Sequence, residues 1–259
     1  KKILNFFFLL IKFNKITILT SGNEKYNLPL RSKYTKVKKV HSRDYSNFLS
    51  YKKTNKIKKN KPIIFLDAPY PYFNGDVEFL YKHKGVTDID RYYKEHNIFF
   101  DKLENLFSTK VIIIPHPKTK GFKNSFFKKR LTDHRIDAVL KLTPSALFVI
   151  SGVFISTAIS YAIASLKPIF IISSEQIESA YKKNIEIEET IKLIGCGFLN
   201  INNFKKKNIL EKMKVNKKLY NIYKKKYLTS EELLKKPNYL TIGNLIKQNT
   251  INMDCQDKI

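Results

Sequence analysis

The stretch from Ser145 to Ser173, "SALFVISGVFISTAISYAIASLKPIFIIS", decides the fold class. "ALFVIS" is a short apolar run, which is typical of a strand buried on both faces of a sheet. The pair Ser156 and Thr157 lies near the start of "FISTAISYAIASL", for which we predict a helix, and "KPIFIIS" then forms a second buried strand. A strand, a helix and a strand in this order predict two parallel strands of one sheet.

The same alternation continues on both sides of this stretch. "PIIFLD" (62–67) and "KVIIIPHP" (110–117) predict two more buried strands, and "GFLNI" (197–201) predicts a short fifth one. Helical spacing of apolar residues lies between them, in 88–107, around 133–142 and in 174–195. We therefore expect an α/β fold, with a Rossmann-like parallel sheet that carries helices on both faces.

Composition divides the chain into three predicted parts. Residues 1–60 are a remnant of an N-terminal domain and a linker, 61–203 form the Rossmann-like domain, and 204–259 form a basic helical tail. Within the first part, "KITILTSG" predicts a strand and a turn. The Lys-rich residues 32–61 are typical of a linker, although "HSRDYSNFLS" favours a short helix capped by Ser42 or Asp44.

The net charge of +27, from 49 basic and 22 acidic residues, has two interpretations. One is a polyanionic partner, such as nucleic acid, anionic lipid or an acidic polysaccharide. The other is an AT-rich genome, whose codons favour Lys, Asn, Ile, Phe and Tyr together. Arginine, which base and bidentate phosphate recognition prefer, is scarce, so we expect no nucleic-acid partner. Lysine clusters alone suffice to attract anionic lipid, so we expect peripheral contact with an anionic membrane.

Two further features bear on the compartment. The apolar run from Phe6 to Ile11 is much shorter than the roughly 20 residues that a spanning helix needs, which favours a buried piece over a signal segment. The two cysteines, Cys196 and Cys255, match no metal-ligand spacing and no disulfide framework. A reducing, cytoplasmic compartment is therefore expected, without a metal site.

Polar residues follow the carboxyl ends of three predicted strands, where ligands bind in open α/β sheets. Asp67 closes the first strand, His116 closes the second, and Ser156 and Thr157 follow the third. A helix N-terminus with added hydroxyls is an anion site, and His116 can add a hydrogen bond or a positive charge. The pattern predicts a site for the phosphate of a nucleotide-sugar. Each element also has a structural alternative: the hydroxyls as a helix cap, His116 as a turn residue and Asp67 as a strand terminator.

Several segments resemble bacterial GT-B glycosyltransferases of capsule and lipopolysaccharide synthesis. "IIIPHP" followed by "FISTAISYAIASLKP" is similar to the His-Pro and Ser/Thr motifs of the sialyltransferase and polysialyltransferase group. "FLDAPYPYFNGD", "YYKEHNIFFDKLE" and "KLYNIYKKKYL" also resemble segments of such enzymes. The resemblance covers roughly residues 41–230, and it implies the C-terminal half of a GT-B fold with most of the first domain missing.

The resemblance also implies roles for individual residues. His116 would contact the donor phosphate and help the leaving group, with Pro117 and Lys118 beside it, and Ser156 and Thr157 would bind the same phosphate. The group requires no metal or other cofactor. The acidic catalytic motif of its first domain has no match in residues 1–60. Asp67 and Asp76 are the nearest acids to the expected cleft, and Asp67 is assigned as general base.

The leading hypothesis is therefore a metal-independent glycosyltransferase. It would move a sugar, by resemblance sialic acid from CMP-sialic acid, to a polysaccharide or lipid-linked glycan acceptor at the cytoplasmic face of the membrane. One alternative is a non-catalytic basic module that binds polyanionic glycan or an anionic membrane surface. Another is a sugar epimerase of similar fold, which would need further carboxylates facing the sugar.

Overall fold

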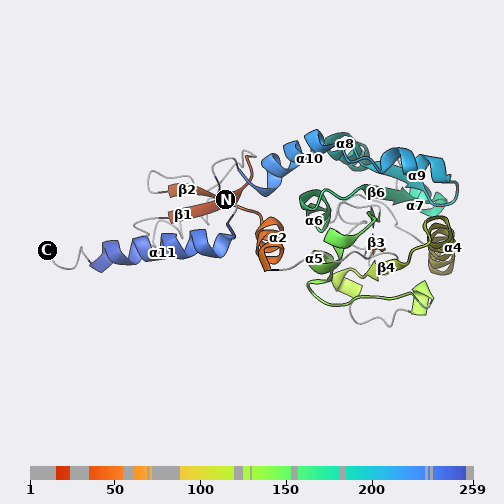
Figure 1. Cartoon of the computed structure of the whole chain (residues 1–259), viewed down its shortest axis with the longest axis horizontal. Helices are drawn as coiled ribbons and strands as arrows, with labels where there is room; N and C mark the ends of the chain where they lie inside the picture. The colour runs from red at the N-terminus through yellow and green to blue at the C-terminus, as the bar shows by residue number, and fades with distance from the viewer. Residues whose placement is uncertain are drawn as a thin grey trace, which may run out of the picture. The chain divides into compact units, whose positions relative to one another are not determined.

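The computed structural model groups the chain into two compact units, one of Lys1–Ser46 with Lys225–Ile259 and one of Asn47–Lys224 (Figure 1). The structure describes residues 16–23, 35–54, 61–68, 71, 88–119, 125–128, 130–152, 157–180, 185–230, 233 and 236–254.

The larger unit contains a five-stranded parallel sheet with the order β4-β3-β5-β6-β7. Its central strand β3 is hydrogen-bonded on both sides, so that Ile64 pairs with Ile112 of β4 and with Val149 of β5. All five predicted strands are confirmed, including the short fifth one. The strands are β3 (Ile63–Leu66), β4 (Val111–Ile114), β5 (Phe148–Ser151), β6 (Ile169–Ser173) and β7 (Gly197–Asn200).

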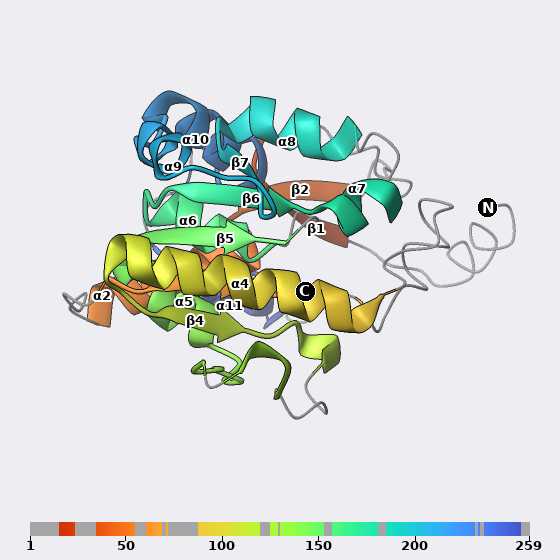
Figure 2. The same ribbon diagram turned by 90° about the vertical axis from the view of Figure 1, so that its right-hand side faces the viewer.

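Helices cover both faces of this sheet, as the alternating pattern predicts. One face packs against α4 (Ile89–Phe107), α7 (Glu175–Ala180) and α9 (Lys206–Lys212). Figure 2 shows α4 lying along the sheet, close to the viewer. The other face packs against α5 (Ala138–Leu142), α6 (Ile159–Ala164), α8 (Ile185–Ile194) and α10 (Lys217–Tyr223).

The continuous apolar run of β3 follows from this two-sided burial. Ile63 and Phe65 belong to the core layer under α4, whereas Ile64 and Leu66 belong to the layer on the opposite face. All four side chains are buried, because successive residues of a strand point to opposite faces and both faces are covered.

The helix α4 forms where the sequence predicts it. Asp88 caps it by accepting a hydrogen bond from the Arg91 amide at 2.9 Å. One of its buried residues, His96, has Nδ1 2.8 Å from the Tyr92 carbonyl oxygen, and burial lowers the pKa of its ring to about 4. His96 is therefore a neutral core residue near neutral pH, in agreement with a structural role.

Three predicted helices are shorter or divided. The stretch around 133–142 is helical only in α5, because Asp133 accepts hydrogen bonds from the Arg135 backbone and guanidinium in a preceding turn. Within the helix expected over "FISTAISYAIASL", α6 has six residues and begins after a turn at Thr157 and Ala158, and residues 154–156 lie outside the described part of the chain. The predicted helix 174–195 is two helices, α7 and α8, and residues 181–184 between them lie outside the described part of the chain.

The smaller unit contains a two-stranded parallel sheet of β1 (Ile16–Ser21) and β2 (Thr35–Val40), together with α11 (Asn238–Asp254). The stretch predicted as a linker thus contains β2 and the helix α2 (Arg43–Thr54). The lysine-rich sequence does not indicate this strand, because Lys36 and Lys38 occupy exposed positions and the strand forms through parallel backbone pairing with β1. The predicted cap is confirmed: Ser42 Oγ accepts from the Tyr45 amide at 3.3 Å.

The residues expected to form one basic tail are shared between the two units. The helices α9 and α10 belong to the larger unit, which we call the sheet unit, whereas residues 225–259 group with the first strands. His41 connects residues 225–259 to the N-terminal part of the smaller unit. The Asn238 side chain accepts a hydrogen bond from the His41 amide at 2.8 Å and donates one to the His41 carbonyl oxygen at 2.7 Å. The division of the chain into three domains stays a prediction.

In the described part of the chain, no helix is long and apolar enough to cross a bilayer, and the Phe6–Ile11 run lies outside the described residues.

We predict that Ile64→Ala lowers the free energy of unfolding by about 2–5 kcal/mol, because the cavity would open at the centre of the sheet. The matched variant Ile98→Ala should change it by no more than about 0.5 kcal/mol, since Ile98 is 44% exposed on α4. Urea unfolding of both variants measures the difference. Equal losses would contradict the central position of β3.

Candidate functional site

The strand order creates a switch point between β3 and β5. The chain adds β4 on one side of β3 and then β5, β6 and β7 on the other, and ligands bind at such points, outside the carboxyl ends of the strands. The segments after the two strands approach closely: the Gly152 amide donates to the Leu66 carbonyl oxygen at 3.3 Å. A Cβ atom placed on Gly152 would lie 3.0 Å from the Cβ of Ala68. Gly152 is not among the site residues predicted from the sequence, although a glycine directly after a buried strand is a usable signal.

Asp67 lies at this switch point with its carboxyl group buried. It directly follows β3, its amide donates to the Ile114 carbonyl oxygen at 2.9 Å, and the residue is 8% exposed. Its Oδ1 atom has no hydrogen-bond partner among the described residues. Burial raises the pKa of Asp67 well above its ordinary value, and the Ala68 backbone amide offsets only part of this rise. Uncompensated buried carboxyl groups are costly, and they cluster at functional sites.

His116 follows the neighbouring strand β4 and begins a tight turn, η1 (Pro117–Thr119). The Lys118 amide donates to His116 Nδ1 at 3.2 Å, and the Thr119 amide and hydroxyl both donate to the His116 carbonyl oxygen at 2.8 Å. Because Nδ1 is an acceptor, the neutral ring carries its proton on Nε2 and can donate from that atom. The structural alternative is also correct here, because His116 does take part in fixing the turn. Pro117 and Lys118 are exposed on it.

Thr157 lies between β5 and α6, on the other side of β3 from His116. Its side chain is exposed, and its carbonyl oxygen accepts from the Ser160 amide at 3.0 Å. The N-cap of α6 is Ala158, so the expected capping role is not seen for Thr157. With six residues, α6 also supplies a smaller dipole than the longer helix that the sequence predicts. Ser156 lies outside the described residues.

The sheet therefore brings two of the predicted residues to adjacent strand ends. The bond between the Asp67 amide and the Ile114 carbonyl oxygen holds the start of the His116 turn beside Asp67. Thr157 comes from the segment that follows β5, the second neighbour of β3. The structure thus groups these residues by strand order, and their roles in binding stay predictions.

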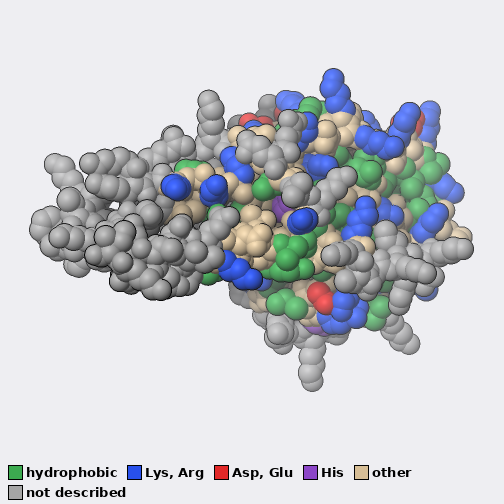
Figure 3. Space-filling model, turned by 60° about the vertical axis from the view of Figure 1, so that its left-hand side comes forward, with side chains coloured by type: hydrophobic (Ala, Val, Ile, Leu, Met, Phe, Trp, Pro, Cys, Tyr) green, Lys and Arg blue, Asp and Glu red, His purple; other side chains and the backbone are tan. Residues whose placement is uncertain are grey.

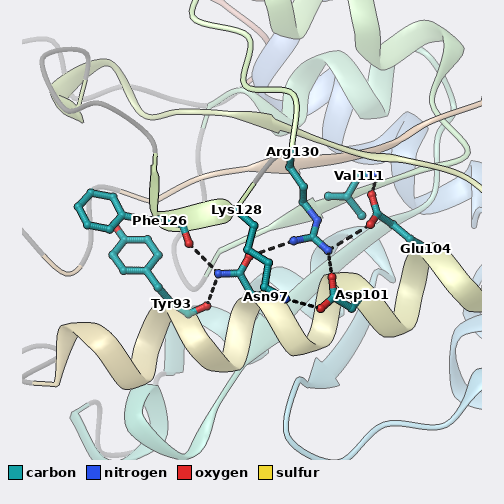
Figure 4. A network of polar contacts seen from close by, with 8 residues as sticks. All are labelled: Tyr93, Asn97, Asp101, Glu104, Val111, Phe126, Lys128 and Arg130. Atoms are coloured by element: carbon teal, nitrogen blue, oxygen red, sulfur yellow. Dashed lines mark hydrogen bonds and ion pairs between the residues drawn. The ribbon is translucent and has the colours of Figure 1, made fainter.

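A groove of about 1160 Å³ lies at the opposite edge of the sheet and is not the candidate site. It is lined by residues such as Pro62 and Lys110, which precede β3 and β4. Its Arg130 side chain is only 6% exposed and is held by the carboxylates of α4 (Figure 4). The Arg130 guanidinium donates to Asn97 Oδ1 at 2.9 Å, to Glu104 Oε2 at 3.1 Å and to Asp101 Oδ1. These contacts neutralise the cation and give it a structural role.

The other reactive groups of the described residues have structural surroundings. Burial raises the pKa of the Cys196 thiol to about 12, so this cysteine is a core residue and not a nucleophile near neutral pH. Within the described ranges, no group of three or more His, Cys, Asp and Glu side chains is arranged to hold a metal ion.

Comparison with known proteins gives distant structural matches alone. No family model matches the chain, and no curated protein matches it. A UDP-GlcNAc 2-epimerase from Methanocaldococcus jannaschii matches with a TM-score of 0.41 and 13% identity, over 82% of this chain and 56% of the epimerase. That epimerase in complex with UDP-GlcNAc and UDP gives a TM-score of 0.39 and 12% identity, over 73% and 53%.

The E. coli ADP-heptose lipopolysaccharide heptosyltransferase II matches with a TM-score of 0.31 and 9% identity, over 76% of this chain and 56% of the transferase. The chain spans little more than half the length of each of these structures. They are enzymes of the GT-B fold, and the similarity is distant and assigns the chain to no specific family.

We predict that Asp67→Asn raises the thermal midpoint at pH 7 by about a few degrees. The unfolded carboxyl ionises near pH 4, and the folded one only at higher pH, so the native state keeps a proton that the unfolded state has lost. The stability of the wild type therefore falls as pH rises through this window. The advantage of the Asn variant should grow from about pH 4 upward and vanish below about pH 3.

The matched control is Asp133→Asn, where the sign is reversed. Arg135 lowers the pKa of Asp133, so this substitution should lower the midpoint at neutral pH. Circular dichroism melts of both variants and the wild type from pH 3 to 8 test the pair. A lower midpoint for Asp67→Asn at pH 7 would show that Asp67 has a stabilising partner after all.

Proposed function

We propose that the chain is the donor-binding part of a GT-B type glycosyltransferase that uses a nucleotide-sugar. The observation that carries this proposal is Asp67, a buried carboxyl group whose Oδ1 atom has no hydrogen-bond partner among the described residues, at the switch point of the sheet. A purely structural strand end gains nothing from such a group, whereas a reaction that moves a proton uses it.

The donor phosphate would lie beside this carboxyl group, at the edge formed by the segments after β4 and β5. His116 would donate from Nε2 to a phosphate oxygen, with Pro117 and Lys118 shaping the turn. Thr157, an exposed residue, and Ser156 would add hydroxyl donors from the segment before α6. Gly152 approaches Ala68 closely and has no side chain, so no side chain from position 152 fills this edge.

The chemistry follows from these positions. Asp67 in its ionised form would take the proton of the acceptor hydroxyl, whose oxygen then attacks the anomeric carbon. The bond between that carbon and the phosphate oxygen breaks, and the electron pair leaves with the nucleotide. His116 would stabilise the charge that develops on the leaving phosphate. The raised pKa of Asp67 brings this base closer to neutral pH, where general bases are most effective.

The finer assignment rests on the motif resemblance. It makes sialic acid carried by CMP the first donor to test, a polysaccharide or lipid-linked glycan the acceptor, and the cytoplasmic face of the membrane the place of action. It also implies transfer without a metal ion. The donor class would be set by the nucleotide that binds at the carboxyl edge beside His116.

Calorimetric titration of the chain with CMP, UDP and GDP tests the donor site. We predict that one nucleotide binds and that His116→Ala weakens its binding about tenfold or more, because a charge-assisted hydrogen bond to phosphate is lost. The control Lys192→Ala changes an exposed side chain of α8 and should stay within about twofold. No binding by a folded chain, or equal losses in both variants, would refute the donor site.

The catalytic step needs a separate measurement, with the donor sugar of the nucleotide that binds. Asp67→Asn should keep nucleotide affinity within about threefold. It should lower the rate of sugar transfer about 10²-fold or more, as loss of a general base does. Unchanged transfer would remove Asp67 from the mechanism, and conversion of the donor sugar without transfer would favour the epimerase alternative.

A further inference from the structure

A strongly basic surface lies on the sheet unit. It consists of the segment from Lys205 to Lys218, and we call it the α9–α10 surface. Seven of its fourteen residues are exposed lysines, against 49 basic residues in the 259 of the whole chain. Its one acidic residue is Glu211. The lysines are Lys205, Lys206, Lys207, Lys212, Lys214, Lys217 and Lys218.

Buried side chains anchor this surface to the core of the sheet unit. Ile209 is buried in the core layer of α4, and Tyr220 is buried in the layer on the opposite face. The Tyr220 hydroxyl donates to the Lys167 carbonyl oxygen at 2.8 Å, and Asn216 caps α10 by accepting from the Leu219 amide at 3.1 Å. The lysines therefore lie on helices that are packed against the core of the sheet unit.

Most of this charge is not neutralised within the described part of the chain. Lys207 lies 3.9 Å from Glu211, with both side chains more than half exposed, and such a pair is weak in water. The arginines of the sheet unit behave differently: Arg91, Arg130 and Arg135 each pair with a carboxylate. Figure 3 shows one face of the molecule, on which Lys and Arg side chains are widespread and Asp and Glu are sparse.

Two aliphatic side chains are exposed among the lysines. Leu210 of α9 is 51% exposed and Ile222 of α10, just beyond the segment, is 44% exposed. Ile222 follows Lys218 by one helical turn, on the side of α10 away from buried Tyr220. Lysines with aliphatic neighbours suit a lipid headgroup layer, where the ammonium groups meet phosphate and the apolar groups enter the acyl boundary.

We infer that the α9–α10 surface docks on an anionic lipid bilayer. Nucleic acid fits less well, because its recognition uses arginine and stacking aromatic side chains, and the exposed apolar groups here are aliphatic. A soluble acidic polysaccharide would leave Leu210 and Ile222 without a role. The inference does not depend on the donor site, so either can fail without the other.

Sedimentation of the full chain with vesicles tests it. We predict binding to phosphatidylcholine vesicles that contain phosphatidylglycerol, and little binding to phosphatidylcholine alone. Lys212→Glu, Lys214→Glu, Lys217→Glu and Lys218→Glu together should reduce the partition coefficient about tenfold or more. The matched control reverses four exposed lysines elsewhere and should reduce it no more than about threefold. The control lysines are Lys94, Lys110, Lys192 and Lys247.

A second variant tests the apolar part without changing the charge. Leu210→Asn with Ile222→Asn should reduce the partition coefficient about threefold or more, whereas a purely electrostatic surface would not respond. Equal losses in the two lysine variants would overturn the inference, because the net charge alone would then explain binding. Binding to a single-stranded oligonucleotide or to heparin that depends on the same lysines, without binding to vesicles, would also overturn it.

Discussion

The position of β3 between β4 and β5 is the constraint on which the rest of the larger unit depends. A strand that is paired on both edges and covered on both faces must be apolar throughout, and β3 is buried at every position. The same position fixes the switch point, because the chain must build outward from β3 in both directions. The residue that follows β3 is therefore placed at the centre of the ligand edge, and that residue is Asp67.

The two edges of the sheet treat buried charge in opposite ways. At the amino edge, carboxylate and amide oxygens from α4 balance the charge of Arg130, although its Nε atom has no hydrogen-bond partner among the described residues. At the carboxyl edge, Asp67 is buried with an oxygen that has no partner among the described residues. A buried ionisable group with no opposite charge beside it, in a protein that pairs another such group, is typical of a residue retained for binding or chemistry. This contrast favours the carboxyl edge as the site.

The sequence predicts the fold better than it predicts the detail of the site. The five strands were predictable because buried parallel strands are apolar runs, and α4 because its apolar residues follow the helical period and Asp88 caps it. The strand β2 was missed because three of its six residues are lysines, and their charge hides a backbone pairing that only the tertiary fold supplies. The sequence also places Ser156 and Thr157 at a helix start, but α6 begins later, because helix boundaries depend on packing that the local pattern does not contain.

The central claim is that a nucleotide binds at the carboxyl edge of the sheet, across the ends of β4, β3 and β5. A crystal structure of the chain with the nucleotide that it binds most tightly tests this claim directly. The account predicts the phosphate within hydrogen-bond distance of His116 Nε2, on the same edge as the Asp67 carboxyl group. A nucleotide bound in the groove beside Arg130, at the amino edge, would contradict the account, because the switch point and its buried carboxyl group would then have no part in binding.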